Sequence, residues 1–431
     1  MHEAGVHTLL VQFTDVHGTA KGKFVPAAHV GDVLRTGAGF AGPSIWGTGL
    51  PRTGPRSEYY ARGDASTLQQ LPWMPGVARI VGDGFVGGGP FEGCPRQVLH
   101  RALQRLSDRG WTLVTGIEPE FFLLRQTDAG WVAADGQDDL DKPSYDLKAL
   151  GRQQDFLHEL AHSLHACGLD VQQLDHEDAH GQYEVNFAHG PALLSADRLM
   201  LLKLAAHTLA EARGMTCSWM AKPLANQPGS GMHWHVSFWQ QDRNLFEPEP
   251  GEAGELSALA RHFVAGVLAH ARALCALAAP TVNSYKRLAA VRSLSGTTWS
   301  PTHATHGPNN RTALVRTLPG RFEWRLPDAS CNPYLVTAAL VAAGLDGIDR
   351  RLDPGAASHA DLYREVPGST DAPALPASLQ EALQALEHDD VVRGALGDEL
   401  ASEFLRLKTE EWAAWAQHVS AWELERYARA F

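Results

Sequence analysis

Four stretches of this sequence carry polar side chains at every second position, and this pattern most constrains how the chain can fold. Residues two apart in a β-strand point to the same side, so each stretch has one polar and one apolar face. The polar faces comprise Glu118 and Glu120 in TGIEPEFFLL, Gln182, Glu184 and Asn186 in GQYEVNF, His233, His235 and Ser237 in GMHWHVSFW, and Arg321, Glu323 and Arg325 in RFEWRLP. Strands of parallel sheets are usually apolar throughout. The pattern therefore predicts a sheet with one face turned toward water, ions or a ligand.

Each polar face also has a simpler interpretation. Glu118 and Glu120 could be exposed glutamates, since charged residues mostly lie at surfaces. His233 and His235 could be ordinary hydrogen-bonded histidines, and the Arg-Glu-Arg face could be an ion-pair ladder of little energetic value. Together, however, carboxylates on one concave face repel each other unless cations lie among them, and arginines suit a polyanionic ligand. The combination indicates phosphoryl transfer, in which positioning and charge neutralisation supply most of the catalysis.

The ligand types favour a hard divalent cation. Glutamates dominate, one or two histidines join them and no cysteine is near, which suits Mg²⁺ or Mn²⁺ better than structural zinc. The sequence has no GxxxxGK[ST] loop and no GxSxG elbow. Gly82, Gly84 and Gly87 spell GxGxxG, but GGP follows where a helix should begin. ATP is therefore expected to bind on the sheet rather than on a glycine-rich loop.

Local patterns predict a β-rich N-terminal region followed by helices that alternate with strands. Residues 1 to 95 contain short strand-like stretches separated by Gly- and Pro-rich turns. Helices are predicted over 152–167 and from a Ser195 cap to Gly214. Pro119 indicates an edge or bulged strand, because proline cannot donate to a β-ladder. Helix and strand in alternation would ordinarily suggest a parallel α/β sheet.

The chain is predicted to be mostly helical from residue 332 onward. Ser378 precedes a helix and is followed three residues later by Glu381, the spacing of a capping box. The final helix is expected to carry one apolar stripe, which comprises Trp412, Trp415, Val419 and Trp422. Such a stripe is more often core or subunit contact than a ligand platform.

Composition narrows the class of protein. A chain of 431 residues can form two or three domains without disulfides or structural metals. Its five cysteines are an odd number with no CxxC pair, which indicates free thiols in a reducing cytoplasm. The first residues lack a signal-peptide pattern, and no uncharged apolar run reaches about 18 residues, so no membrane partner is expected. The net charge of −12 argues against nucleic acid as a partner.

Six segments resemble the signature segments of glutamine synthetases, in the same order: GIEPEFF, HEDAHGQYEVNF, GSGMHWHVS, PTVNSYKR, NNRT and GRFEWRLPDASCNPYL. The resemblance spans nearly the whole chain. It implies an α+β fold with a small β-grasp-like N-terminal domain (residues 1–95) and a catalytic domain (residues 96–431). In the latter, helices back an antiparallel β half-barrel, which replaces the parallel sheet suggested by alternation. It also implies a ring homo-oligomer in which one subunit's N-terminal domain closes its neighbour's active site.

The resemblance assigns roles to individual residues by motif position. Two or more Mg²⁺ or Mn²⁺ ions are implied, one held by Glu120, Glu177 and Glu184 and another by Glu118, His233 and Glu323. The positions that contact ATP are His235, Ser237, Arg316 and Arg321. The positions that bind glutamate are Glu120, Gly229, His233, Arg287, Arg311 and Arg325. The positions implied in catalysis are Arg311, Arg316 and Glu323.

The implied reaction has two steps. The side-chain carboxylate of glutamate attacks the terminal phosphate of ATP, and ammonia or an amine then attacks the resulting γ-glutamyl phosphate. Two acids of the ammonia-using enzymes are missing, because Ala41 replaces an aspartate in GFAGPS and Ser293 stands where a flap glutamate is usual. The flap-like stretch VRSLSGTTWSPTHATHG has no acid, and Pro228 replaces the asparagine usual before GSG.

These departures favour the branch that contains type III glutamine synthetases and γ-glutamylmethylamide synthetases. Ala41 and Trp299 would suit an amine with a methyl or larger group, since burying one methylene contributes about 0.8 kcal/mol. Ammonia, methylamine, polyamines and anilines stay open as acceptors. A catalytically inactive relative with a structural or regulatory role is the alternative, although all six candidate metal ligands are present. A metallohydrolase using the same carboxylates would turn over without ATP.

Overall fold

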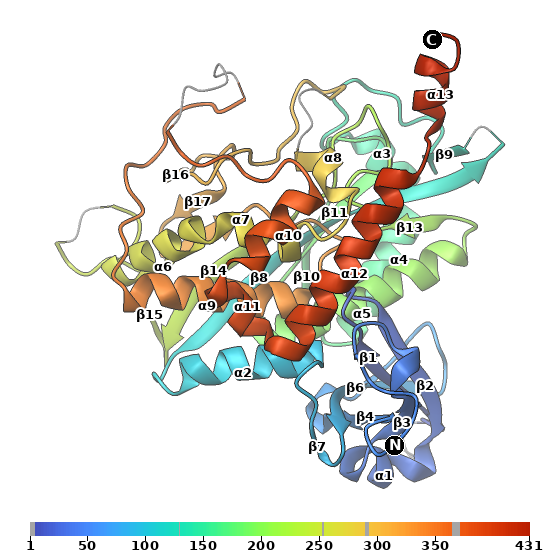
Figure 1. Ribbon diagram of the computed structural model, residues 1–431. Helices are drawn as coiled ribbons and strands as arrows, with labels where there is room; N and C mark the ends of the chain where they lie inside the picture. Colours follow the sequence, from blue (N-terminus) through green and yellow to red (C-terminus); the bar gives the residue numbers. More distant parts are fainter. Residues whose placement is uncertain (1–4, 129, 252–253, 289–292, 364–370) are drawn as a thin grey trace.

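The computed structural model describes the chain except residues 1–4, 129, 252–253, 289–292 and 364–370. Part of the flap-like stretch, residues 291–292, therefore lies outside the described residues. The described residues form two β-sheets, a smaller one from the N-terminal strands and a larger one from the strands that follow. Most helices pack around the larger sheet (Figure 1).

The smaller sheet contains the N-terminal strands in the order β2-β1-β6-β4-β3, with β5 and β7 paired to β6. Its strands are β1 (Thr8–Thr14), β2 (Ala20–Pro26), β3 (Ala38–Ala41), β4 (Glu58–Gly63), β5 (Gln69–Gln70), β6 (Val77–Val86) and β7 (Gly89–Pro90). The helix α1 (Val30–Arg35) lies against β4. The GxGxxG stretch belongs to β6 and its hairpin with β7, and no helix follows until Pro95. This stretch is therefore not a Rossmann turn. The sequence had predicted this, because GGP follows where a helix should begin.

The larger sheet has the order β10-β11-β8-β14-β18-β17-β16, and β9, β12, β13 and β15 pair at its margins. Its main strands are β8 (Thr112–Thr127), β10 (Val171–His176), β11 (Gln182–Phe187), β14 (Met232–Gln240), β16 (His306–Pro308), β17 (Val315–Leu318) and β18 (Arg321–Trp324). The marginal strands are β9 (Gly130–Ala133), β12 (Gly190–Pro191), β13 (Thr216–Ser218) and β15 (Arg243–Asn244). The described pairs are antiparallel except β16 with β17. The predicted α+β fold with an antiparallel half-barrel is confirmed.

The remaining helices follow along the chain, and most of them pack on the apolar side of this sheet or on one another. They are α2 (Pro95–Ser107), α3 (Leu147–Arg152), α4 (Gln154–Ala166), α5 (Ala192–Glu211), α6 (Ala258–Ala269), α7 (Ala271–Ala278), α8 (Ser284–Leu288), α9 (Pro333–Asp349), α10 (Leu379–Glu387), α11 (Asp390–Leu396), α12 (Asp398–Gln417) and α13 (Ala421–Tyr427). The helix α9 is buried along nearly its whole length and packs closely on α6. A Cβ atom at Gly344 would lie 2.1 Å from the Phe263 ring, so glycine allows this close approach.

The structure corrects one local prediction about a helix cap and qualifies another about a strand. Ser195 does not cap α5, which begins at Ala192; its hydroxyl instead donates to the Thr115 carbonyl oxygen at 3.0 Å and ties the helix to β8. Pro119 was predicted at an edge or bulged position, and it lies in β8, a central strand of the sheet, opposite Met232 of β14. The proline is tolerated because the ladder between β8 and β11 ends at Glu120, next to it.

The predicted Trp stripe is divided between two helices. The chain leaves the helical conformation after Gln417 and re-enters it at Ala421, so Val419 lies in the connection. Trp412 packs against the core, whereas Trp422 is 60% exposed on a helix that extends beyond the rest of the molecule (Figure 1). Most of the predicted stripe therefore lies outside the core of this chain. The prediction that it contacts another subunit stays a prediction.

The Ser378 cap is confirmed, because its hydroxyl accepts from the Glu381 amide at 3.2 Å.

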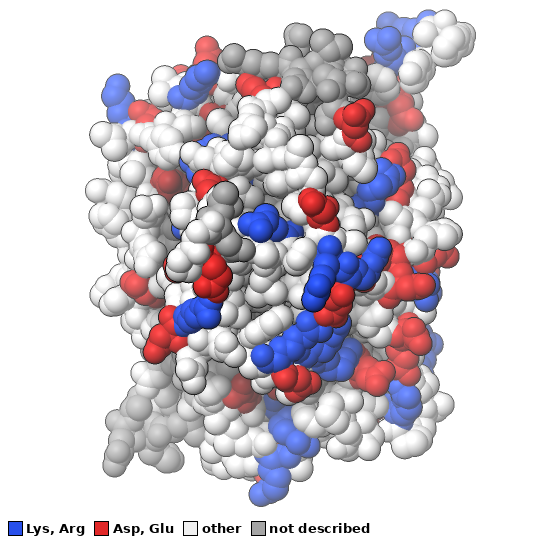
Figure 2. Space-filling model, turned by 90° about the vertical axis from the view of Figure 1, so that its left-hand side faces the viewer, with Lys and Arg blue, Asp and Glu red and all other residues white. Residues whose placement is uncertain are grey.

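No helix among the described residues is long and apolar enough to cross a membrane. Acidic and basic side chains gather side by side on the face shown in Figure 2. All five cysteines are free and buried.

Candidate functional site

The four predicted polar faces meet because their strands are neighbours in the larger sheet. The ladder pairs His233 with Glu118 across β14 and β8, and His235 with Glu323 across β14 and β18. Across β11 and β8 it pairs Glu184 with Glu120. Since the apolar faces of the same strands pack on the helices, the polar faces must turn the other way. The alternation in the sequence therefore gathers these side chains on one surface.

This surface lines a cavity of about 500 Å³. The lining includes Glu118, Glu120, Ser144, Tyr145, Gln173, Asp175, Glu177, Asp178, Gln182, Glu184, Asn186, Pro228, Gly229, His233, His235, Trp299, Arg311, Arg316, Leu318, Arg321, Glu323 and Arg325. A second cavity of about 490 Å³, lined among others by Ser237, shares its border with the first through Glu118, Gln173, Asn186, His235 and Arg321. The two cavities therefore form a continuous depression along the sheet.

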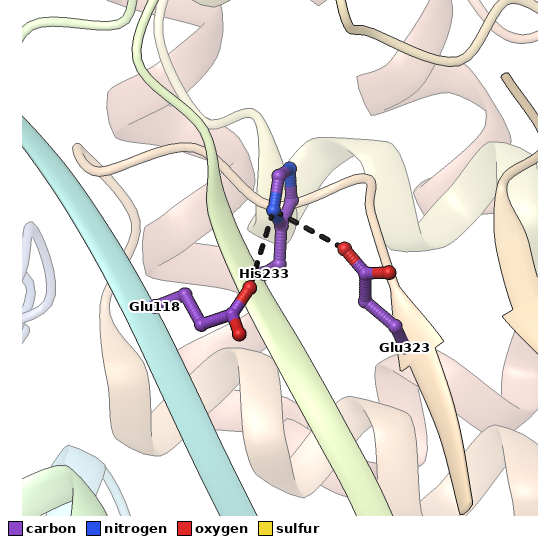
Figure 3. Close-up of side chains that lie close together, drawn as sticks. All are labelled: Glu118, His233 and Glu323. Atoms are coloured by element: carbon purple, nitrogen blue, oxygen red, sulfur yellow. Dashed lines mark ion pairs between the residues drawn. The ribbon is translucent and has the colours of Figure 1, made fainter. Parts of the chain in front are cut away.

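Glu118, His233 and Glu323 form one cluster that could hold a metal ion. Figure 3 shows the three side chains pointing toward one another from β8, β14 and β18. The Nδ1 atom of His233 lies 3.8 Å from Oε2 of Glu118 and 3.3 Å from Oε1 of Glu323. One nitrogen and two carboxylate oxygens are a donor set that binds divalent cations.

Neighbouring positive groups keep the carboxylates of this cluster ionised. Burial opposes ionisation of Glu323, but the charges of Arg325 and His233 outweigh it and lower its pKa to about 2. Burial likewise opposes ionisation of Glu118, and hydrogen bonds from His233 and His235 lower its pKa below the usual value. These carboxylates are therefore charged over the physiological pH range.

Asp175, Glu177 and Glu184 form a second cluster of potential ligands. Burial and the repulsion of the Glu120 and Asp175 carboxylates raise the pKa of Glu177. Burial and the Glu177 carboxylate do the same for the pKa of Glu184, and burial with the charge of Glu118 raises the pKa of Asp175. Such mutual repulsion among half-buried acids is the electrostatic condition that a bound cation would relieve.

The second cluster differs in one member from the set that the sequence predicted. Glu120 lines the same cavity, but its Oε2 atom accepts from Gln182 Nε2 at 2.8 Å and from the Gly231 amide at 2.9 Å. Asp175 was missed, although the sequence held a signal for it. Asp175 and Glu177 are two residues apart in the strand-like DVQQLDHE, so the same alternation rule puts them on one face.

Four of the five predicted arginines line the cavity, and Arg287 does not. The Nη1 atom of Arg316 lies 2.9 Å from Oε2 of Glu323, and Arg325 pairs with the other oxygen. Arg321 Nε donates to His235 Nδ1 at 3.2 Å. Arg287 is 2% exposed and donates to the Leu326 and Arg325 carbonyl oxygens behind the cavity wall. Arg287 is therefore held by the backbone next to the cavity, and its predicted role in binding glutamate stays a prediction.

The remaining predicted positions, Gly229 and Ser237, each line one of the two cavities. Gly229 lines the first cavity, where a Cβ atom would lie 2.3 Å from the Ala221 carbonyl oxygen. Ser237 lines the second cavity and accepts from Trp239 Nε1 at 2.9 Å. Among the described lining residues of the first cavity, none comes from the segment 38–44 that contains Ala41. Asp178 and Tyr145, which the sequence reasoning also missed, line it together with Trp299.

The fold and this site define an ATP-dependent ligase of the glutamine synthetase type. A family model described as glutamine synthetase, catalytic domain, matches residues 92–427, and the chain belongs to that family. The family uses ATP and divalent metal ions. Membership confirms the resemblance seen in the six sequence segments.

Individual relatives narrow the branch. The chain is 49% identical to a glutamate–methylamine ligase of Methyloversatilis universalis, over 100% of this chain and 98% of that protein. It is 39% identical to a glutamine synthetase of Rhizobium meliloti, over 98% of this chain and 96% of that protein. A solved structure described as a GmaS/ADP complex superposes with a TM-score of 0.92 at 41% identity, covering 99% of this chain and 98% of the other. This chain is therefore a glutamate–amine ligase, with methylamine and ammonia both open as acceptors.

Proposed function

We propose that this chain joins the side-chain carboxylate of glutamate to a small amine by way of γ-glutamyl phosphate. The observation that carries the proposal is that two clusters of three potential metal ligands face one cavity that arginines also line. Separated donors of this kind suit the neutralisation of a triphosphate next to a carboxylate. The similarity to the glutamate–methylamine ligase of Methyloversatilis universalis supports a small amine as acceptor.

Divalent cations fit the donor set. We propose two or more Mg²⁺ or Mn²⁺ ions, held by Glu118, His233 and Glu323 on one side and by Glu177, Glu184, Glu120 and Asp175 on the other. Oxygen donors with one imidazole favour these hard ions. When bound, such ions would neutralise the phosphate oxygens and make the terminal phosphorus easier to attack.

The side chains of the cavity would do the remaining work by position and charge. ATP would occupy the continuous depression, with its phosphates near His235, Ser237, Arg316 and Arg321. Glutamate would lie near Gly229, Glu120, His233, Arg311 and Arg325. We propose that Arg311 and Arg316 stabilise the negative charge that develops on the transferring phosphoryl group. Glu323 would hold Arg316 and Arg325 in place through its two ion pairs.

The assembly and the division of the chain are also proposals. Residues 1–95 would form the N-terminal domain and residues 96–431 the catalytic domain, supported by the two separate sheets. In a ring homo-oligomer, the segment around Ala41, which does not line its own chain's cavity, would complete the neighbour's site. Five free cysteines suit a cytoplasmic location.

The test is ADP release from ATP in the presence of glutamate and Mg²⁺ or Mn²⁺, with ammonium, methylamine, ethylamine or putrescine as acceptor. We expect ADP release to require glutamate, amine and metal together, and to stop on addition of EDTA. Turnover of substrate without ATP would indicate a metallohydrolase instead. Absence of ADP release with every amine would indicate a catalytically inactive relative.

A further inference from the structure

One end of the first cavity is lined by residues that lie outside the two metal-ligand clusters and do not line the second cavity. The border with the second cavity runs through His235 and Arg321, so the nucleotide would enter from that side. Ser144, Tyr145, Asp178, Pro228 and Trp299 line the first cavity but not the second. The acceptor amine must reach the acyl carbon from a side that ATP does not fill. This end of the cavity is therefore where the acceptor would bind.

Trp299 is held in an unusual conformation at this end. Its φ is 54°, a left-handed value that bulky residues rarely adopt. Tyr145, the other aromatic residue among the described side chains with positive φ, has φ of 66° and lines the same end. Backbone conformations of this kind persist only where the surroundings impose them, and they concentrate at functional sites.

Asp178 fixes the Trp299 side chain. The indole Nε1 donates to Asp178 Oδ2 at 2.8 Å, and the Ser295 hydroxyl donates to the same oxygen. Ser144 donates to the other oxygen, Oδ1, at 2.9 Å. The Asp178 side chain is only 6% exposed, although it lines the cavity. One carboxylate thus joins three separate segments of the chain at the acceptor end.

The backbone of Trp299 is held from the opposite direction. Arg325 Nη2 donates to the Trp299 carbonyl oxygen at 3.3 Å, and Arg325 also pairs with Glu323 of the first metal-ligand cluster. Trp299, which remains 40% exposed, is therefore fixed at both its ring and its backbone. A fixed apolar surface next to the amine site would stabilise an N-alkyl group by burying it. It would not stabilise ammonium, which has no apolar part.

We propose that Trp299 determines selectivity for an alkylamine over ammonium, and that Asp178 is the positioning residue that orients the indole. The inference rests on the proposed function and deepens it by naming the acceptor class. The indole forms the wall against which the N-alkyl group packs, and burial of one methyl favours methylamine by about fourfold, corresponding to ~0.8 kcal/mol. The described flap residues include no acid that could select ammonium. In this proposal the choice of amine depends on contact with its alkyl group instead.

The test is the ratio of kcat/KM for methylamine to kcat/KM for ammonium, measured on one preparation of each full-length variant. This ratio is independent of the fraction of folded enzyme, so a merely structural defect leaves it unchanged. We expect wild type to favour methylamine, and Trp299→Ala to lower the ratio by about fourfold or more. The same variant should raise kcat/KM for ethylamine relative to methylamine, because the cavity becomes larger.

The Asp178 contact is tested by a double-mutant cycle. Trp299→Phe keeps an aromatic ring but loses the Nε1 donor, and Asp178→Ala removes the carboxylate that accepts from it. Each should lower the ratio, and the double variant should lower it no further, because both remove the same hydrogen bond. Trp131→Phe on β9, whose side chain is 48% exposed, should leave the ratio at the wild-type value.

The outcomes separate the two proposals. If wild type releases ADP with neither amine, the proposed function fails. If wild type is active but prefers ammonium, or if Trp299→Ala retains the wild-type ratio, the selectivity inference fails while the ligase function stands. If the Asp178→Ala and Trp299→Phe effects multiply in the double variant, Asp178 does not act through the indole.

Discussion

Arg316 and Glu323 occupy opposite positions in the ladder between β17 and β18, and Arg316 Nη1 lies 2.9 Å from Glu323 Oε2. Glu323 thus forms an ion pair with each of two arginines, Arg316 and Arg325. It also belongs to the metal-ligand cluster with Glu118 and His233. With a side chain only 1% exposed, it has no access to water as an alternative partner. It connects the metal-ligand cluster to the arginines that face the phosphate.

Glu323→Gln should therefore abolish phosphoryl transfer without unfolding the protein. Glutamine keeps the size and one accepting oxygen, but it loses the charge that pairs with Arg316 and Arg325. We expect ADP release to fall by more than ~100-fold, beyond the range for residues that only orient a ligand. Circular dichroism and elution volume should stay at wild-type values. Glu211→Gln, at the exposed end of α5, is the matched control and should keep full activity.

Asp175→Asn tests the ligand that sequence reasoning missed. Asparagine removes one charge from the cluster of Asp175, Glu177 and Glu184. We expect Mn²⁺ affinity, measured by titration calorimetry, to fall by about 10- to 100-fold. Asp170→Asn changes an exposed aspartate just before the same strand and should leave the affinity unchanged. Equal affinities in wild type and Asp175→Asn would remove Asp175 from the set of ligands.

Glu184→Gln should stabilise the metal-free protein at high pH. Because burial and neighbouring acids raise the pKa of Glu184, the folded state favours its protonated form. The resulting stability is present below the unfolded-state pKa and is lost as pH rises through the folded-state pKa. In EDTA at pH 9, the variant should melt about 1–3 °C above wild type, and at pH 4 the two should coincide. A variant that melts below wild type at pH 9 would contradict this expectation.

The sequence predicted most of the site because the chemistry followed a local rule. Alternation alone placed Glu118, His233 and Glu323 on polar faces, and the ladder then brought those faces together. The rule was not applied to DVQQLDHE, which is why Asp175 was missed. It could not reveal that Arg287 lies behind the wall, since burial depends on packing between distant segments.

The errors in the fold have the same origin. Ser195 looked like a cap, yet its hydroxyl is used in a long-range bond to Thr115, which no local pattern encodes. Pro119 was expected at an edge or bulged position, and only the structure shows that it lies in a central strand where the ladder to β11 ends beside it. The bond between Asp178 and Trp299 joins residues 121 positions apart and could be found only in the structure.

Arg96→Met tests how the N-terminal sheet is attached to the helices. Arg96 on α2 is 3% exposed and pairs with Asp64, Asp83 and Asp197, each at 2.9 Å. Removing it leaves Asp197, whose side chain is 7% exposed, without its cation. We expect a loss of about 3–5 kcal/mol in urea unfolding, the usual effect of breaking a buried ion pair. Arg105→Met on the exposed side of the same helix should cost far less.

His270 should make stability depend on pH outside the active site. It lies between α6 and α7, with Nδ1 2.7 Å from Asp389 Oδ2 and Nε2 3.1 Å from Asp346 Oδ2, and Arg350 also pairs with Asp346. Burial lowers the pKa of His270, but hydrogen bonds to Asp389 and Asp346 outweigh it and raise the pKa above its usual value.

The sign of the effect follows from that direction. Stabilisation by the charged imidazole is complete below the unfolded-state pKa of about 6.5 and is lost as pH rises through the folded-state pKa. His270→Gln should therefore cost about 1 kcal/mol more stability at pH 6 than at pH 9 in urea unfolding. A cost for His270→Gln that grows with pH would show that His270 is neutral in the folded protein.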